Sequence, residues 1–284
     1  MKQVKYWILA TRPQTLIASI GPVLISTIFS HKYFNFNLII FLFIIISSVL
    51  IQIMTNFIND LYDFKKGGDK ENRLGPDRMV QKGLISEIEI KKAIIFLLCL
   101  SVFSGLYLVF VGGWIILAIG LSSFLFAYLY TATRFSIAYN GLGEFFVFVY
   151  FGLIASIGTA YLQTNLYLFD TAVIGCIFGF LNMSLLIINN IRDVNEDAKS
   201  NKKTLVVLFG QKFGFIELFI SLIFPIIFYF KLIEDFSYIS VILLIFAVYI
   251  FLFTYKSKKF RENNALPITS LYIVFFTTIL MYSL

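Results

Sequence analysis

Residues 56–69 read NFINDLYDFKKGGD, a stretch that begins inside a long apolar run and leaves it carrying carboxylates. Asp60 lies four residues after Asn56 and three before Asp63, so a helix places the three side chains on one face. A charged side chain inside a membrane span is unfavourable and usually marks a functional site. The stretch therefore predicts an oxygen-rich site at the end of an apolar helix.

The composition around this stretch is that of an integral membrane protein. The chain has 284 residues, of which 59% are hydrophobic and only 14% charged, and its mean hydropathy is +0.87. A soluble domain has about 25% charged residues. Cys99, Cys176 and His31 stand apart from one another, which argues against a disulfide framework or a thiolate metal site.

Apolar runs near the length that a bilayer requires predict nine transmembrane helices. We expect an all-α fold in which these helices surround a central cavity, within a single polytopic membrane domain, 1–284. Residues 1–12 are basic and aromatic and are expected along the interface. The predicted spans are about 14–30, 36–62, 88–110, 113–131, 140–162, 168–191, 212–230, 236–256 and 265–283.

The basic residues predict the orientation of these spans. Of the 23 Lys and Arg residues, 21 lie in the N-terminal segment or in and beside the even-numbered connections, and only Lys32 and Lys231 lie on the other side. Because Lys and Arg gather in cytoplasmic loops, the N-terminus and these connections are expected in the cytoplasm and the C-terminus outside. The net charge of +7 thus does not imply a nucleic-acid partner.

A second acidic motif ends the sixth predicted span. Asn189, Asp193 and Asp197 are spaced by four and four, and basic residues follow them as they follow the first motif. The recurrence predicts two four-helix pseudo-repeats, about 10–135 and 136–260, with 265–283 added as a further span. Repeats of this kind place the site between the halves.

Two such motifs can bind divalent metal together with a diphosphate. Carboxylate and amide oxygens suit Mg²⁺, which typically takes one or two carboxylates and fills its other positions with water and phosphate oxygens. The basic residues beyond each motif would add charge-assisted contacts to phosphate. The alternative for either motif alone is a set of ordinary interface residues; their occurrence at matching span ends favours a site.

A diphosphate bound at a membrane boundary points to an isoprenoid or lipid-linked substrate. Metal coordination makes diphosphate a good leaving group, and an allylic chain then ionises to a carbocation that aromatic faces stabilise. Tyr62, Phe145 and Tyr150 are candidates for that contact, although lipid packing also accounts for them.

The pattern Asn-Asp-x-x-Asp-x-x-x-Gly-x-Asp over residues 59–69, the later Asp-x-x-x-Asp and the nine predicted spans resemble the UbiA superfamily of membrane prenyltransferases. Within it, residues 10–15, 72–78, 138–144 with 158–163, and 189–193 with 203–205 resemble the MenA type, the 1,4-dihydroxy-2-naphthoate polyprenyltransferases of menaquinone synthesis. The resemblance runs from about residue 5 to 215. Ala160 and the stretch Thr131–Arg134 depart from the family pattern near the acceptor.

The resemblance implies that a polyprenyl group passes from an allylic prenyl diphosphate to 1,4-dihydroxy-2-naphthoate, with Mg²⁺ as cofactor and loss of CO₂ and diphosphate. It implies catalytic roles for Asp60, Asp63, Asp193 and Asp197. The implied metal ligands are Asn56, Asp60, Asp63, Asp69, Asn189, Asp193 and Asp197. The implied diphosphate contacts are Arg73, Arg78, Lys82, Arg192, Lys202 and Lys203. The implied acceptor pocket is Tyr139, Asn140, Glu144, Tyr161 and Gln163, for which polar contacts between packed helices are the alternative.

Two other functions remain open at this point. The same metal site serves a related acceptor, 4-hydroxybenzoate or homogentisate. A cation-coupled transporter would instead use the intramembrane carboxylates as ion sites. Soluble prenyl diphosphate synthases also have paired aspartate motifs, but the nine apolar spans exclude them. The MenA resemblance favours a bacterial inner membrane, with lipid and the two substrates as partners; the oligomeric state is not predicted.

Overall fold

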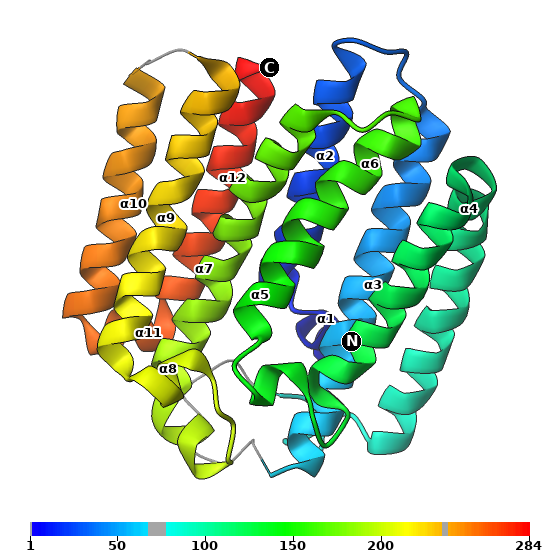
Figure 1. The fold of residues 1–284 in the computed structure, drawn as a ribbon. Helices are drawn as coiled ribbons and strands as arrows, with labels where there is room; N and C mark the ends of the chain where they lie inside the picture. Colours follow the sequence, from blue (N-terminus) through cyan, green and yellow to red (C-terminus); the bar gives the residue numbers. More distant parts are fainter. Residues whose placement is uncertain (1, 68–77, 235–237) are drawn as a thin grey trace.

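The computed structural model describes residues 2–67, 78–234 and 238–284, and in these residues helices and turns are the regular elements (Figure 1). The helices are α1 (Lys2–Thr11), α2 (Ile17–His31), α3 (Leu38–Lys65), α4 (Glu87–Thr131), α5 (Gly143–Phe148), α6 (Ala155–Thr164), α7 (Phe169–Lys199), α8 (Leu205–Phe209), α9 (Gln211–Ile233), α10 (Tyr238–Lys256), α11 (Lys258–Asn263) and α12 (Ala265–Ser283). Two 3-10 turns, η1 (Pro13–Thr15) and η2 (Ile137–Tyr139), and one π-helix, η3 (Val149–Ile154), complete them.

The helices are long and apolar enough for a membrane protein, as the composition predicts. Seven of them in the described part of the chain could cross a bilayer, or eight when the pair on either side of a 52° bend, 3–15 and 17–31, is taken as one span. The sequence count of nine also treats α4 as two spans. An all-helical integral membrane fold is therefore confirmed, whereas nine crossings stay a prediction.

The break inside α4 lies at Gly113. Its φ of 69° and ψ of −155° are not helical, and residues without a Cβ adopt that conformation most readily. The chain therefore turns back there, and Figure 1 shows α4 as two arms that meet at the upper right. The predicted spans 88–110 and 113–131 correspond to these arms.

Local capping sets where the helices at the site begin. The Asn37 side chain accepts hydrogen bonds from the backbone N–H groups of Ile39 and Ile40 at the start of α3. At the start of α4, Ser86 and Glu89 form a reciprocal capping box. Each cap accepts hydrogen bonds from backbone N–H groups that have no partner within the first turn, and it stabilises the helix by about 1 kcal/mol. Because α3 starts at Asn37, its acidic residues fall in its last two turns.

The helix α7 lies at the centre of the bundle and has the largest buried share of the candidate spans, 72%. It packs against α2, α5, η3, α6, α9 and α12. The Asn182 side chain of α7 donates to the carbonyls of Ala18 and Phe151, and so ties α2 and the π-helix to it. The last turns of α3 and α7 thus lie at the same end of the molecule, at the bottom of Figure 1.

Candidate active site

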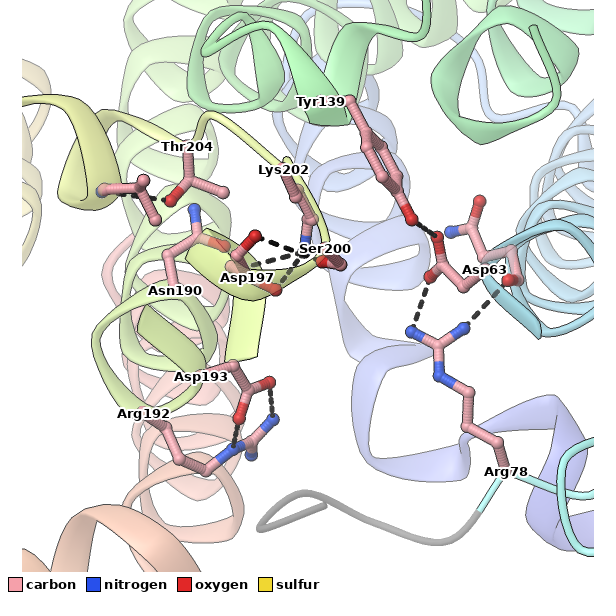
Figure 2. A network of polar contacts seen from close by, with 12 residues as sticks. Asp63, Arg78, Tyr139, Asn190, Arg192, Asp193, Asp197, Ser200, Lys202 and Thr204 are labelled. Carbon is pink, nitrogen blue, oxygen red and sulfur yellow. Dashed lines mark hydrogen bonds and ion pairs between the residues drawn. The ribbon is translucent and has the colours of Figure 1, made fainter. Parts of the chain in front are cut away.

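The two acidic motifs face each other across a polar cavity of about 210 Å³. The cavity lies between the N-terminal segment with η1, the end of α3, the start of α5 and the end of α7. Its polar and aromatic lining consists of Arg12, Gln14, Thr15, Asn59, Asp60, Asp63, Arg78, Tyr130, Thr131, Glu144, Asn189, Asn190, Arg192, Asp193, Lys202 and Thr204. Figure 2 shows the α7 side chains opposite those of Asp63 and Arg78.

Asp60 lines this cavity and has one carboxylate oxygen without a hydrogen-bond partner among the described residues. The side chain is 3% exposed, and its Oδ2 accepts a hydrogen bond of 3.1 Å from the backbone N–H of Met79. Its Oδ1 is buried and has no hydrogen-bond partner among the described residues. A buried charged oxygen without a partner is strongly unfavourable, so Asp60 is suited to a cation that the protein alone does not supply.

Asp63 is held by two partners from other segments. Its Oδ2 lies 2.6 Å from a guanidinium nitrogen of Arg78, and its Oδ1 accepts a 2.9 Å hydrogen bond from the Tyr139 hydroxyl. Arg78 also donates to the backbone carbonyl of Asn59 at 2.8 Å. Arg78 and Tyr139 therefore connect the first acidic motif to the chain on either side of α4 (Figure 2).

Lys66, just beyond α3, fixes the segment that carries Tyr139. Its Nζ donates to the Thr133 carbonyl at 2.7 Å and to the Ser136 hydroxyl at 2.8 Å, and lies 4.3 Å from the centre of the Tyr139 ring. Burial lowers the pKa of Lys66, because burial penalises the charged form, and the Asp63 charge offsets part of that effect.

We expect Lys66→Met to loosen the segment 132–140. Hydrogen bonds to a charged group contribute about 1.5–3 kcal/mol each, so trypsin should cleave after the exposed Arg134 at least about tenfold faster. The matched control is Lys65→Met, because Lys65 makes an exposed 3.5 Å ion pair with Glu87 and lies 5.5 Å from the centre of the Tyr62 ring, and neither contact involves the segment 132–140. Equal cleavage rates for the two variants would show that Lys66 does not hold the segment.

The second acidic motif is also paired with basic side chains. Arg192 and Asp193 form a bidentate pair, with distances of 2.6 and 2.7 Å, and both residues are buried. The Lys202 ammonium lies 3.2 Å from each oxygen of Asp197. These cations neutralise the carboxylates, and they also stand at the cavity wall, where an anion would meet them.

Glu144 is connected to the site through Asn190, a residue that the sequence analysis did not identify. Glu144 is 3% exposed, and its Oε1 accepts a 2.7 Å hydrogen bond from the Asn190 side chain. The bond connects the start of α5 to α7 directly behind Asn189. The expected placement of Glu144 and Asn189 at the cavity therefore agrees with the structure.

Asn56 does not line the cavity, in contrast to the expectation. Its amide nitrogen donates to the Thr11 carbonyl at 2.9 Å and so anchors α1 to α3. Asn59 lines the cavity instead, and its Oδ1 accepts a hydrogen bond from Thr131. The i, i+4 spacing from Asp60 drew attention to Asn56, but α1 covers that position on the helix.

The expected acceptor residues are not brought together. Gln163 exchanges two 3.1 Å hydrogen bonds with the backbone of Asn37, at the opposite end of α3 from Asp60. With about 1.5 Å per residue, that end is roughly 35 Å from Asp60. Tyr161 stacks on Tyr167 at the same end of the molecule. Asn140 is exposed and donates to the Ser136 carbonyl.

The remaining expected residues divide by location. Lys82 and Lys203 are exposed and lie outside the cavity lining, and the Lys203 backbone N–H donates to the Tyr139 carbonyl. Asp69 and Arg73 lie outside the described residues.

The sequence reasoning also missed Arg12 and Tyr130, both of which line the cavity. Arg12 lies in the stretch 10–15, which resembles the MenA type, and that resemblance could have identified it. Nothing in the local pattern marks Tyr130.

The donor set fits a divalent metal with a phosphate ligand rather than a preformed metal cage. Among the described residues, no three His, Cys, Asp or Glu side chains gather closely enough to hold an ion between them. Mg²⁺, however, uses only one or two carboxylates and takes phosphate oxygens for its other positions. Asp60 and Asp63 of α3 and Asp193 of α7 line the cavity and provide that partial set, whereas Asp197 lies outside the lining, paired with Lys202.

A second cavity, about 300 Å³ in volume and mostly apolar, adjoins the polar one. It lies between α3, both arms of α4 and the α5–η3–α6 segment, and Tyr130 lines both cavities. The pair of cavities therefore suits a molecule with an anionic head and apolar parts.

Comparison with known proteins agrees with this geometry. The model of the UbiA prenyltransferase family matches residues 19–280. The 1,4-dihydroxy-2-naphthoate octaprenyltransferase of Escherichia coli is 34% identical over 220 residues, which cover 74% of this chain and 70% of that protein. The enzyme of the same name from Haemophilus influenzae is 33% identical over 228 residues, 75% of this chain and 72% of that protein.

Solved structures have the same fold. A UbiA homolog from Archaeoglobus fulgidus bound to GPP and Mg²⁺ has a TM-score of 0.61 at 17% identity, over 98% of this chain and 99% of that one. An apo UbiA homolog from Aeropyrum pernix K1 has a TM-score of 0.67 at 13% identity, over 93% and 94% of the two chains.

Proposed function

Because the chain belongs to the UbiA prenyltransferase family and is a membrane-bound prenyltransferase, we propose that it transfers a polyprenyl group to 1,4-dihydroxy-2-naphthoate in menaquinone synthesis. The observation that carries the proposal is the pair of acidic motifs at one cavity, with a buried oxygen of Asp60 that has no hydrogen-bond partner among the described residues. The identity to two enzymes named for that acceptor supports the choice of ring.

The diphosphate of the donor binds in the polar cavity. Mg²⁺ held by Asp60, Asp63, Asp193 and Asp197, with Asn189 beside them, would neutralise the diphosphate and make it a better leaving group. Arg78, Arg192 and Lys202 lie at the wall already charged and oriented by carboxylates. Each can exchange part of that pairing for phosphate oxygens, which accept charge-assisted hydrogen bonds.

The reaction breaks the bond between the prenyl C1 and the diphosphate oxygen and forms a bond from C1 to the carboxylate-bearing ring carbon. The electron pair of the broken bond leaves with diphosphate, and the ring regains aromaticity as CO₂ departs. The prenyl cation needs protection from water and a stabilising surface. The apolar cavity beyond Tyr130, with the rings of Phe126, Phe146 and Tyr150 in its wall, provides both.

The proposal includes the arrangement in the membrane. Counting the two arms of α4 separately, and the bent pair 3–15 and 17–31 as one span, gives nine crossings, grouped as two repeats with α12 added. The distribution of basic residues supports a polar cavity on the cytoplasmic side, and the similarity to bacterial enzymes supports a bacterial inner membrane. Membership of a prenyltransferase family argues against a cation-coupled transporter. It does not separate dihydroxynaphthoate from 4-hydroxybenzoate and homogentisate, which remain alternative acceptors.

The acceptor is tested with purified protein, a labelled prenyl diphosphate and each of the three aromatic acids. We expect prenylated product with carboxyl-labelled dihydroxynaphthoate, release of the label as CO₂, and loss of turnover when EDTA removes divalent metal. A product formed only from 4-hydroxybenzoate or homogentisate would mean that this acid, and not dihydroxynaphthoate, is the acceptor. Turnover that persists in EDTA would mean that the reaction does not require a divalent metal.

A further inference from the structure

The α3 face that carries the acidic motif continues one turn deeper into the membrane than Asn56. Gln52 lies four residues before Asn56 and eight before Asp60, which places it on the same face and about 12 Å deeper along the helix. The side chain is 7% exposed and lines the apolar cavity. Its amide oxygen Oε1 is buried and has no hydrogen-bond partner among the described residues.

An amide oxygen in this position requires a donor that the protein does not provide. Ser47 pairs with Ser104, and Thr55 and Ser123 donate to backbone carbonyls of their own helices. The Thr159 hydroxyl, in the same wall, is buried and, like the Gln52 oxygen, has no hydrogen-bond partner among the described residues. An unsatisfied buried acceptor is unfavourable, and a ligand that donates to it gains the whole of that interaction. Of the two groups, the Thr159 hydroxyl can both donate and accept, whereas the amide oxygen of Gln52 only accepts and so requires a donor from a ligand.

Aromatic side chains form part of the same wall. Phe126 lies 4.7 Å from Phe146 and 5.3 Å from Tyr150, and the rings of Phe146 and Tyr150 are nearly parallel, at 11°. Apolar pockets with aromatic walls and a single well-placed polar group are typical small-molecule sites. A polyprenyl chain contains no hydrogen-bond donor and would leave Gln52 unsatisfied, whereas a ring hydroxyl would not.

We propose that Gln52 binds a hydroxyl group of the aromatic acceptor, so that the ring lies in the near part of the apolar cavity with its carboxylate toward the polar one. This inference rests on the proposed function and specifies its acceptor site. The carboxylate-bearing carbon must meet the prenyl C1 beside the diphosphate, near Tyr130. The hydroxyl at ring position 4, away from the carboxylate, is the one that reaches inward to the amide oxygen.

The acceptor site is tested by direct binding of two naphthoates to the purified protein, measured by titration calorimetry without turnover. 4-Hydroxy-2-naphthoate keeps the hydroxyl that Gln52 receives, and 1-hydroxy-2-naphthoate lacks it. We expect Gln52→Leu to weaken the first about 10- to 100-fold, as loss of a buried hydrogen bond does, and to leave the second unchanged. Ser48→Ala, one turn deeper in the same wall, should change neither.

Two outcomes overturn the inference: equal loss of affinity for both naphthoates, or no loss for either. The Gln52→Leu chain is expected to fold, because the change removes an unsatisfied amide from an apolar wall, and a thermal melt checks this. The proposed function is tested separately by turnover of the wild-type protein. A wild type that transfers no prenyl group to any acceptor contradicts that function, and the two affinities still decide whether Gln52 recognises the hydroxyl.

Discussion

Asp60→Asn is expected to lower prenyl transfer by at least about 100-fold, the effect of removing one preorganised electrostatic group from an active site. The reason lies in the two oxygens of Asp60. One accepts the Met79 N–H, and the other is buried without a hydrogen-bond partner among the described residues. Asparagine can keep the bond to Met79 through its remaining oxygen, but it then presents an NH₂ group to the cavity, which repels a cation instead of binding it.

The control for this change is Asp170→Asn. Asp170 lies in the first turn of α7, is exposed and stands at the end of that helix remote from Asp193. Turnover of both variants is measured with equal amounts of folded protein, judged by gel filtration and helical content. Wild-type turnover in Asp60→Asn would contradict the role of Asp60, and a parallel loss in Asp170→Asn would show that the assay reports folding.

Gly152→Ala is expected to destabilise the bundle by about 3 kcal/mol or more, since added volume at a tight contact forces backbone shifts. Gly152 is in the π-helix η3, and it packs on two glycines of α7. A Cβ added there would lie 2.6 Å from Cα and 2.7 Å from N of Gly179, and would also meet the carbonyl of Gly175. These are backbone atoms, which cannot move away as a flexible side chain does.

The matched control is Gly105→Ala in α4. A Cβ at Gly105 would meet nothing within 4 Å, and alanine favours a helix over glycine by about 1 kcal/mol. In detergent, the melting temperature of Gly152→Ala should fall by at least several degrees, while that of Gly105→Ala stays the same or rises. Equal melting temperatures for Gly152→Ala and the wild type would mean that η3 and α7 do not touch as described.

The sequence was sufficient for those parts of the fold that depend on local pattern. Apolar runs of span length predict the helices because the bilayer permits little else. The i, i+4 spacing of Asp193 and Asp197 predicts a shared face of α7. Asp193 lines the cavity together with the α3 carboxylates, and Lys202 lies 3.2 Å from Asp197. Recurrence of the motif at two span ends correctly indicated that these ends face each other.

Which side chains contact one another depends on the packing between helices, and a local sequence pattern does not show that packing. Asn56 lies four residues before Asp60, yet α1 packs over it, and the Asn56 amide donates a hydrogen bond to the Thr11 carbonyl. Tyr161 and Gln163 follow Glu144 on the same span, but a span is long, so these residues lie at the other end of the bundle. Gln52 is a single polar residue in an apolar run, and the cavity that it lines forms only where α3, α4 and the α5–η3–α6 segment pack together.

The central claim is that the two acidic motifs bind one diphosphate through divalent metal, and binding of an unreactive prenyl thiodiphosphate to the purified protein tests it most directly. The affinity is measured by titration calorimetry with Mg²⁺ and with EDTA, for the wild type, Asp60→Asn and Asp197→Asn. The account predicts binding that requires Mg²⁺ and weakens at least about tenfold in each variant, one from each motif. Equal affinity in Mg²⁺ and EDTA, unchanged in both variants, would contradict it.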